Sequence, residues 1–142
     1  MITTIDANDS RSIQNKEAVL GLYDMMINQK KGPEAVKKYL TPEYIQHNPL
    51  IPTGAESLGA FFGQVAAGRP NLRVVVHKII ATGDYVWAHV NFLNLYNDNP
   101  DDRGIAGVDI YRFDTNGKIA EHWDTLQEVP EPEKSANTNG MF

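Results

Sequence analysis

The sequence predicts one α+β domain, a curved antiparallel sheet wrapped by N-terminal helices around a single ligand-sized pocket. Before Pro70, apolar residues recur at the spacing of helices, whereas after it short β-forming runs are separated by turn residues. Strand and helix patterns do not alternate along the chain, which argues against a parallel sheet. The 142 residues suffice for one hydrophobic core but not for two.

The first half of the chain predicts three helices. The first spans residues 15–31 and has an apolar stripe that includes Val19 and Leu22. Gly32 ends it, and a second helix, residues 33–40, follows. Thr53 and Glu56 have the spacing of a capping box, which predicts the start of a third helix that closes near Gly68.

The second half predicts four strands joined by turns. A Thr-Gly-Asp turn at 82–84 separates the first two, and the turn at 114–117 separates the last two. The predicted strands are residues 72–81, 85–96, 105–113 and 118–128. We expect a flexible N-terminus over 1–14, a domain over 15–129 and a C-terminal tail over 130–142, in which Met141 and Phe142 form an anchor.

Composition narrows the possible functions. The net charge of -5 argues against a nucleic-acid partner, because phosphate binding depends on clustered Lys and Arg. No apolar run is long enough to cross a membrane, and the polar start predicts a cytoplasmic protein. The chain has no Cys, no helical His pair at zinc spacing and no Gly-rich phosphate loop, so we predict neither a metal nor a cofactor.

His122 and Asp124 are the candidate catalytic residues. Side chains alternate between the two faces of a strand, so these two share one face of the predicted last strand. A carboxylate beside an imidazole can serve as base and acid, or one group can orient the other. The alternative is structural: Asp124 satisfies a buried donor and His122 lies at the rim.

The register of the last hairpin decides what faces this pair, and two registers are open. If Gly117 adopts a left-handed conformation in a three-residue turn, Val108 faces Asp124 and Ile110 faces His122. Such apolar walls would raise the pKa of the carboxyl group. A slip of one residue would instead bring Asp109 beside the pair as a second carboxylate.

Other side chains are candidates for the pocket. A short strand near Tyr44 would place Tyr44 and Gln46 on one side and His47 on the other, either at the pocket mouth or in a loop that pins two helices. His89 contacts a ligand or is an ordinary core or surface histidine, and His77 is predicted to be exposed. The candidate ligand contacts are Tyr44, His47, His89, Val108, Ile110 and Trp123.

Four segments carry a family resemblance: YIQHNP at 44–49, GDYVW at 83–87, GKIAEHWD at 117–124 and the ending NGMF. They are similar to SnoaL-like proteins of the nuclear transport factor 2-like superfamily, and in particular to bacterial members labelled as predicted aldol-condensation enzymes. The resemblance implies a cone-shaped fold, a homodimer formed through the sheet and chemistry without a cofactor. By likeness to the family's polyketide cyclases, Asp124 would be the general acid/base, with His122 beside it.

Three functions are therefore open. The first is a cofactor-independent lyase or isomerase that acts on a small carbonyl compound with Asp124 as base. The second is a non-catalytic, ligand-binding dimer in which the same polar groups only orient a metabolite. The third is a hydrolase in which Asp124 activates water. In each case the predicted partner is a small-molecule ligand.

Overall fold

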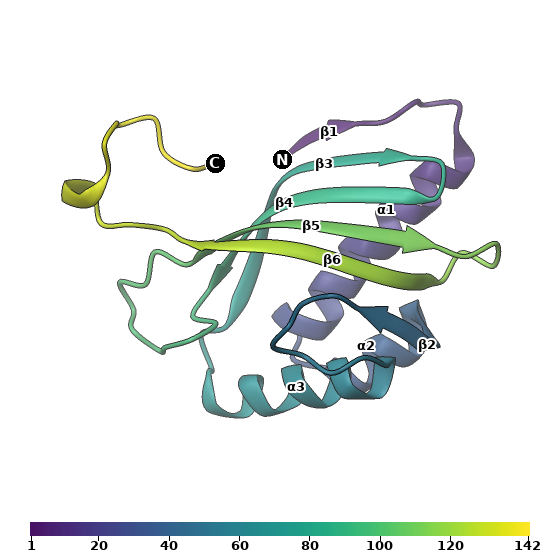
Figure 1. The fold of residues 1–142 in the computed structure, drawn as a ribbon, viewed down its shortest axis with the longest axis horizontal. Coiled ribbons are helices and arrows are strands. Elements are labelled where there is room, and N and C mark those ends of the chain that lie inside the picture. Colours follow the sequence, from purple (N-terminus) through teal and green to yellow (C-terminus); the bar gives the residue numbers. More distant parts are fainter.

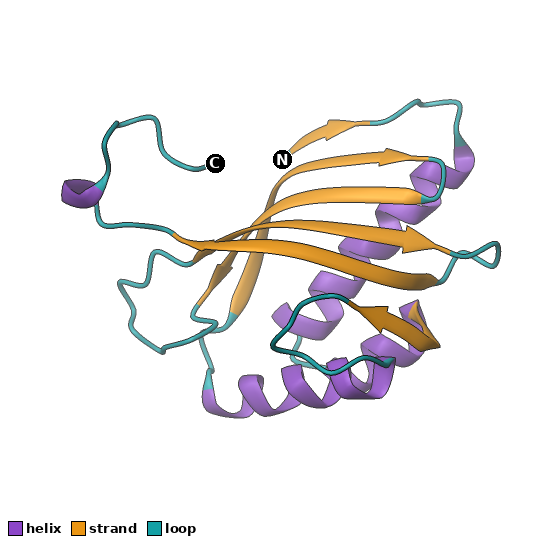
Figure 2. Cartoon of the chain, in the orientation of Figure 1, coloured by secondary structure: helices purple, strands orange, loops and turns teal.

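The computed structural model describes residues 1–142 and confirms the α+β fold class. Its sheet has six strands in the order β1-β3-β4-β5-β6-β2, and the helices cover one face of it (Figures 1 and 2). The elements are β1 (Ile2–Thr4), α1 (Ser10–Tyr23), α2 (Gly32–Tyr39), β2 (Leu40–Gln46), α3 (Ala55–Gly68), β3 (Arg73–Thr82), β4 (Tyr85–Leu93), β5 (Ile105–Phe113) and β6 (Ile119–Glu128).

The N-terminal helix begins earlier than residue 15. The Asp9 side chain caps it by accepting from the Ser12 amide at 3.0 Å, which starts α1 at Ser10. A π-helical turn, Asp24–Asn28, extends α1 at its other end. Asn15 is buried and donates to the Gly83 carbonyl, so it joins the helix to the turn between β3 and β4.

The predicted capping box at the start of α3 is wrong. The residue before the helix is Gly54, whose φ of 99° lies in the left-handed region, and no side chain caps the helix. The Thr53 hydroxyl instead donates to the Tyr44 carbonyl and accepts from the Gln46 amide. Thr53 therefore stabilises β2 and the loop after it rather than the helix.

The central strands pair as predicted, but the edges of the sheet do not follow the hairpin pattern. The pairs β3–β4, β4–β5 and β5–β6 are antiparallel. β1 pairs parallel with β3, and β2 pairs parallel with β6. Both edge strands come from the helical half of the chain, and the pairing of β2 brings Gln46 opposite His122.

A bulge sets the register of the last hairpin. Gly117 has a φ of 74°, and Phe113 pairs with Ile119 as the three-residue turn predicts. The register then shifts by one residue, so that Arg112 pairs with Glu121 and Asp109 pairs with Asp124. The register in which Val108 faces Asp124 is therefore wrong beyond the bulge, and the alternative with Asp109 is the one that forms.

The C-terminal tail leaves the domain after β6 and returns to the sheet near the N-terminus (Figure 1). The Phe142 ring stacks on His77 with ring centroids 4.2 Å apart and lies 5.3 Å from the ring of His89. These contacts agree with the anchor predicted for Phe142, and they leave His77 partly buried rather than exposed. None of the helices has the length and apolar character to span a bilayer.

Candidate functional site

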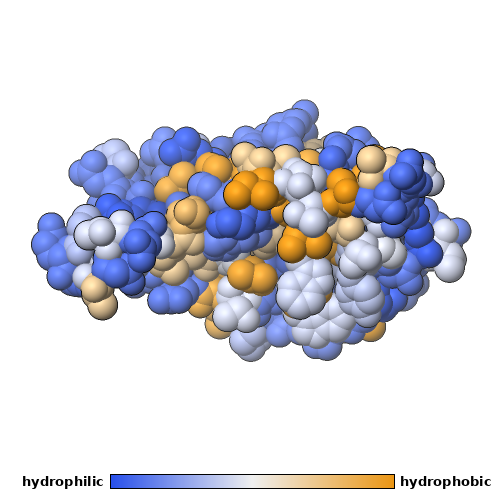
Figure 3. Space-filling model, turned by 90° about the horizontal axis from the view of Figure 1, so that it is seen from above, coloured by the Kyte–Doolittle hydropathy of each residue, from blue (hydrophilic) through white to orange (hydrophobic).

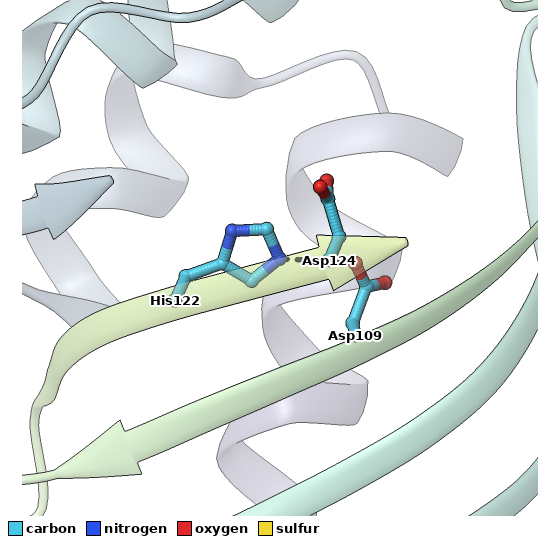
Figure 4. Close-up of side chains that lie close together, drawn as sticks. All are labelled: Asp109, His122 and Asp124. Carbon is cyan, nitrogen blue, oxygen red and sulfur yellow. Dashed lines mark hydrogen bonds and ion pairs between the residues drawn. The ribbon is translucent and has the colours of Figure 1, made fainter. Parts of the chain in front are cut away.

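The bulge in β6 gathers three titratable side chains on the helix-covered face of the sheet. Asp109 comes from β5, and His122 and Asp124 come from β6 (Figure 4). One ligand atom from each lies within 4.8 Å of the others. Asp109 and His122 are buried, with 2% and 7% of their surface exposed, whereas Asp124 is only partly buried. The predicted pair is thus a cluster of three.

Both ring nitrogens of His122 are hydrogen-bonded. Nδ1 lies 2.8 Å from Gln46 Oε1, and Nε2 lies 3.0 Å from Asp109 Oδ1. The ring also packs against Tyr111, with centroids 4.8 Å apart, and is stacked near Tyr44. These partners hold the imidazole in one orientation and leave neither nitrogen free for a ligand.

Asp109 is held from the helical side of the cluster. The hydroxyl of Tyr23, the last residue of α1, donates to its Oδ2 atom. Burial and the charge of Asp109 raise the pKa of Tyr23 well above its ordinary value, so the phenol stays protonated and acts as the donor. The two oxygens of the Asp109 carboxyl group therefore have one partner each, Tyr23 and His122.

Asp124 differs from Asp109 because part of it is accessible. Its Oδ2 atom accepts from Asn48 Nδ2 at 2.7 Å. Desolvation raises the pKa of Asp124, while the Asn48 hydrogen bond and the charge of His122 oppose that rise. A carboxyl group with a raised pKa and an accessible surface is suited to accept and return a proton.

A small cavity adjoins the cluster. Its volume is about 40 Å³, room for one to a few water molecules and far below the roughly 300–1,000 Å³ of typical ligand pockets. The prediction of a ligand-sized pocket is therefore wrong for this structure. The lining is mostly apolar and consists of Leu22, Tyr23, Met26, Ile27, Tyr44, Gln46, Ile51, Leu58, Phe62, Phe92, Asp109, Tyr111, His122 and Asp124.

Of the predicted site residues, the structure places three at the cavity. Tyr44, His122 and Asp124 all line it, and Tyr44 and Gln46 share the inner side of β2 as the alternation predicted. The prediction that Val108 and Ile110 contact the ligand is wrong. Both alternate with the inward Asp109 and so lie on the outer face, where Val108 is exposed. The bulge is the reason, because it moves every β5 residue by one position relative to β6.

The other three predicted ligand contacts also lie on the outer face. His89 contacts Phe142, and His47 stacks on Trp123 with centroids 4.7 Å apart and an interplanar angle of 5°. None of them lines the inner cavity. His47 points outward because it follows Gln46, which points inward, along the same extended segment.

His47 belongs instead to an outer cluster with Trp123, Glu121 and Arg112. Its Nε2 atom lies 2.8 Å from Glu121 Oε1, and Arg112 Nε donates to Glu121 Oε2 at 2.7 Å. The hydrogen bond from His47, followed by that from Arg112, lowers the pKa of Glu121. This cluster fastens the end of β2 to the outer side of β6, directly behind His122.

Four further residues of the inner site were not predicted as site residues: Tyr23, Gln46, Asn48 and Tyr111. The alternation in the segment 44–49 places Gln46 with Tyr44, and this signal could have identified Gln46. Tyr23 looked like a core residue of a helical stripe, because its partner Asp109 lies 86 positions away in the sequence. Its hydroxyl could not be assigned without the register of β5.

The donor set of Asp109, His122 and Asp124 is also of a kind that binds divalent cations. Each of the three side chains is already engaged: His122 by Gln46 and Asp109, and Asp124 by Asn48. A cation would therefore have to displace hydrogen bonds that order the site. Proton transfer, in contrast, does not require the three side chains to rearrange.

A family model described as a SnoaL-like domain matches residues 19–122. No curated protein matches the chain. Among solved structures, a candidate polyketide cyclase from Bacillus cereus ATCC 10987 is 22% identical, with a TM-score of 0.72 over 88% of this chain and 83% of that one. TsrD from Streptomyces laurentii is 21% identical, with a TM-score of 0.63 over 85% and 91%.

An NTF2-like protein of unknown function from Mesorhizobium loti is 19% identical, with a TM-score of 0.66 over 89% of this chain and 99% of that one. At these identities the three likenesses show the fold. The matched family segment ends at His122, so it includes Asp109 and His122 of the inner cluster, and Asp124 follows two residues later on β6.

Proposed function

Since this chain belongs to the SnoaL-like domain family, we propose that it is a cofactor-independent lyase or isomerase that acts on a small carbonyl compound, with Asp124 as the general base. The observation that supports this role is the partly buried Asp124 carboxyl group at the inner cavity, beside His122 and with a raised pKa. A base of raised pKa holds a proton more firmly once it has removed it from carbon.

In this reaction Asp124 removes a proton from a carbon next to a carbonyl group, and the electrons move into the carbonyl to form an enolate. The Tyr44 hydroxyl is placed to stabilise that oxygen. It accepts from Gln46 Nε2 at 3.1 Å, so its own hydrogen is available to a ligand in the cavity. Burial raises the pKa of Tyr44, so the phenol keeps its hydrogen at neutral pH.

His122 is not placed to donate a hydrogen bond to the developing oxyanion. Its two nitrogens are bonded to Gln46 and Asp109, so a direct hydrogen bond to substrate would break one of these contacts. His122 acts through its charge and through its position beside Asp124. Donors aimed at developing charge contribute a few kcal/mol each, about 3–4 for a well-placed one, which is the contribution we assign to Tyr44.

The size of the cavity limits the substrate. A volume of about 40 Å³ cannot hold a compound of more than a few heavy atoms. A larger ligand enters only if lining side chains move apart, and Ile51 lies in the loop between β2 and α3, next to the exposed Leu50. We therefore expect small ketones to be better first probes than polycyclic compounds, and β-keto esters to enter only if the lining side chains move apart.

The test is hydrogen exchange at carbon. The protein is incubated in D2O with a panel of small ketones and β-keto esters, and the loss of their α-hydrogens is followed by proton NMR. We expect Asp124→Asn to reduce catalysed exchange by about 10²–10⁴-fold, the usual contribution of a general base. Asp101→Asn is the matched control, because Asp101 is exposed and is not among the residues that line the cavity. Exchange at the wild-type rate in Asp124→Asn would exclude Asp124 as the base.

A non-catalytic binding protein is the second candidate, and the mostly apolar lining of the cavity favours it. In that case the wild-type protein exchanges none of the probes, yet a metabolite co-purifies and is recovered unchanged after long incubation. Mass spectrometry of the denatured protein distinguishes the two functions, because a turned-over ligand would appear as product.

The outer face of the sheet supports a further proposal, a homodimer formed through it. Ile80, Trp87 and Ile110 are paired across β3, β4 and β5, and Ile80 and Trp87 are 48% and 46% exposed. Apolar residues gather near the middle of the view in Figure 3, with hydrophilic residues at both ends. Light scattering should give a dimer for the wild type and a monomer for Trp87→Glu; a wild-type monomer would contradict it.

A further inference from the structure

We propose that Asp109 holds His122 as a doubly protonated imidazolium, so that Asp124 is left as the only base of the inner site. Asp109 and His122 are then positioning residues that act through Asp124. The proposal about the proton stands on hydrogen-bond geometry and on the charges around the ring, whereas its consequence for catalysis rests on the function proposed above.

The hydrogen bonds of the Gln46 amide fix its orientation. The backbone amide of Asn48 lies 3.0 Å from Gln46 Oε1, and a backbone N–H can only donate. The atom that it meets must therefore be the carbonyl oxygen of Gln46 and not its nitrogen. The opposite atom, Nε2, donates to the Tyr44 hydroxyl, which agrees with this orientation.

The second step concerns Nδ1 of His122. It lies 2.8 Å from the same Gln46 Oε1 atom, which has only lone pairs to offer. Two acceptors at this distance would repel each other, so Nδ1 must bear a hydrogen. A neutral imidazole has one hydrogen in total, and in this site that hydrogen is at Nδ1.

The third step concerns Nε2, which lies 3.0 Å from Asp109 Oδ1 (Figure 4). With Nδ1 protonated, a neutral His122 would present a lone pair at Nε2 to a carboxylate oxygen. A second hydrogen must lie between these two atoms, either on His122 or on Asp109. The pair therefore holds one more proton than a neutral imidazole beside a carboxylate.

Three features place that hydrogen on His122. In water an imidazole binds a proton more firmly than a carboxylate does, by about 2.6 pKa units. Tyr23 donates to the other oxygen of Asp109, which favours the ionised carboxylate. Asp124 is the third member of the cluster, with an oxygen within 4.8 Å of a His122 ring nitrogen, and its negative charge favours the imidazolium.

The remaining neighbours of the ring are uncharged. Tyr44 and Tyr111 pack against it, and burial keeps both phenols protonated by raising the pKa of each. No lysine or arginine lines the cavity to compete with the imidazolium for the two carboxylates. The positive charge of His122 therefore opposes the rise in the pKa of Asp124 that desolvation causes, and it keeps that carboxylate ionised and able to accept a proton.

The test counts the hydrogens on His122 by nitrogen-15 NMR of histidine side chains at pH 7.5. We expect both ring nitrogens of His122 to carry hydrogen in the wild type, with the signal assigned by its loss in His122→Gln. In Asp109→Asn, the new amide can donate to Nε2, so we expect His122 to keep the Nδ1 hydrogen and lose the other. Asp101→Asn, an exposed acid-to-amide change, should leave the wild-type signals unchanged.

A wild-type His122 with a single hydrogen at pH 7.5 would overturn the proposal, whether or not Asp109→Asn folds. Where a probe is exchanged, Asp109→Asn should also shift the pH midpoint of exchange upward, because the positive charge lost at His122 affects the pKa of Asp124 more than the negative charge lost at Asp109; an unchanged midpoint would contradict the positioning role. A protein that shows the imidazolium but exchanges no probe would refute the proposed activity and leave this inference intact.

Discussion

Removal of the Tyr23 hydroxyl tests whether α1 and the inner cluster depend on each other. In Tyr23→Phe the Oδ2 atom of Asp109 loses its only hydrogen-bond donor, and the carboxyl group remains 2% exposed. A hydrogen bond to a charged group contributes about 1.5–3 kcal/mol, and water cannot readily replace the donor at a buried position. We therefore expect the free energy of unfolding to fall by about 1.5–3 kcal/mol.

At about 4 °C per kcal/mol for a chain of this length, that loss lowers Tm by roughly 6–12 °C. Urea unfolding followed by far-UV circular dichroism measures it, and an unchanged m-value would show that the native state keeps its compactness. Tyr85→Phe is the matched control, because Tyr85 is 40% exposed and we expect a change within about 0.5 kcal/mol. Equal small losses in both variants would refute the view that Tyr23 satisfies a buried Asp109 carboxylate.

Three other predictions follow from the pKa shifts. Burial raises the pKa of Asp124, so the folded state binds this proton more firmly than the unfolded state does. The ionised carboxyl group therefore lowers the stability of the wild type once the pH exceeds the unfolded-state pKa. Urea unfolding should show a larger gain in stability for Asp124→Asn over wild type at pH 7 than at pH 3.5. His47→Ala should raise the pKa of Glu121, measured by carbon-13 NMR, because its main stabilising hydrogen bond is lost. Phe142→Ala should raise the pKa of His89, measured by proton NMR, because the ring that shields it from water is gone.

The sequence predicted the layers of the fold because those depend on local patterns. The apolar stripe at Val19 and Leu22 and the turns at 82–84 and 114–117 each act over a few residues, and the structure has the helices and hairpins that they indicate. The parallel pairing of β2 with β6 could not be predicted from the sequence. It joins segments about 80 positions apart, and no local pattern in Leu40–Gln46 specifies a partner.

For the site, the sequence identified His122 and Asp124 through strand alternation, and it left Asp109 as an alternative. The outcome depended on one extra residue in β6, and a bulge of this kind has no signature in composition. The same bulge moved Val108 and Ile110 to the outer face. Tyr23 and Asn48 could not be assigned for a related reason, because each meets its carboxylate only through tertiary packing.

Titration of one carboxyl group tests the proposed role of Asp124 most directly. Carbon-13 NMR of protein labelled at aspartate follows each side chain with pH, and the resonance absent from Asp124→Asn belongs to that residue. We expect a midpoint for Asp124 clearly above the usual aspartate value of about 3.9, because burial raises its pKa more than the Asn48 hydrogen bond and the His122 charge lower it. A midpoint at or below that value would mean that water reaches this oxygen pair freely, and the proposed base would lose its support.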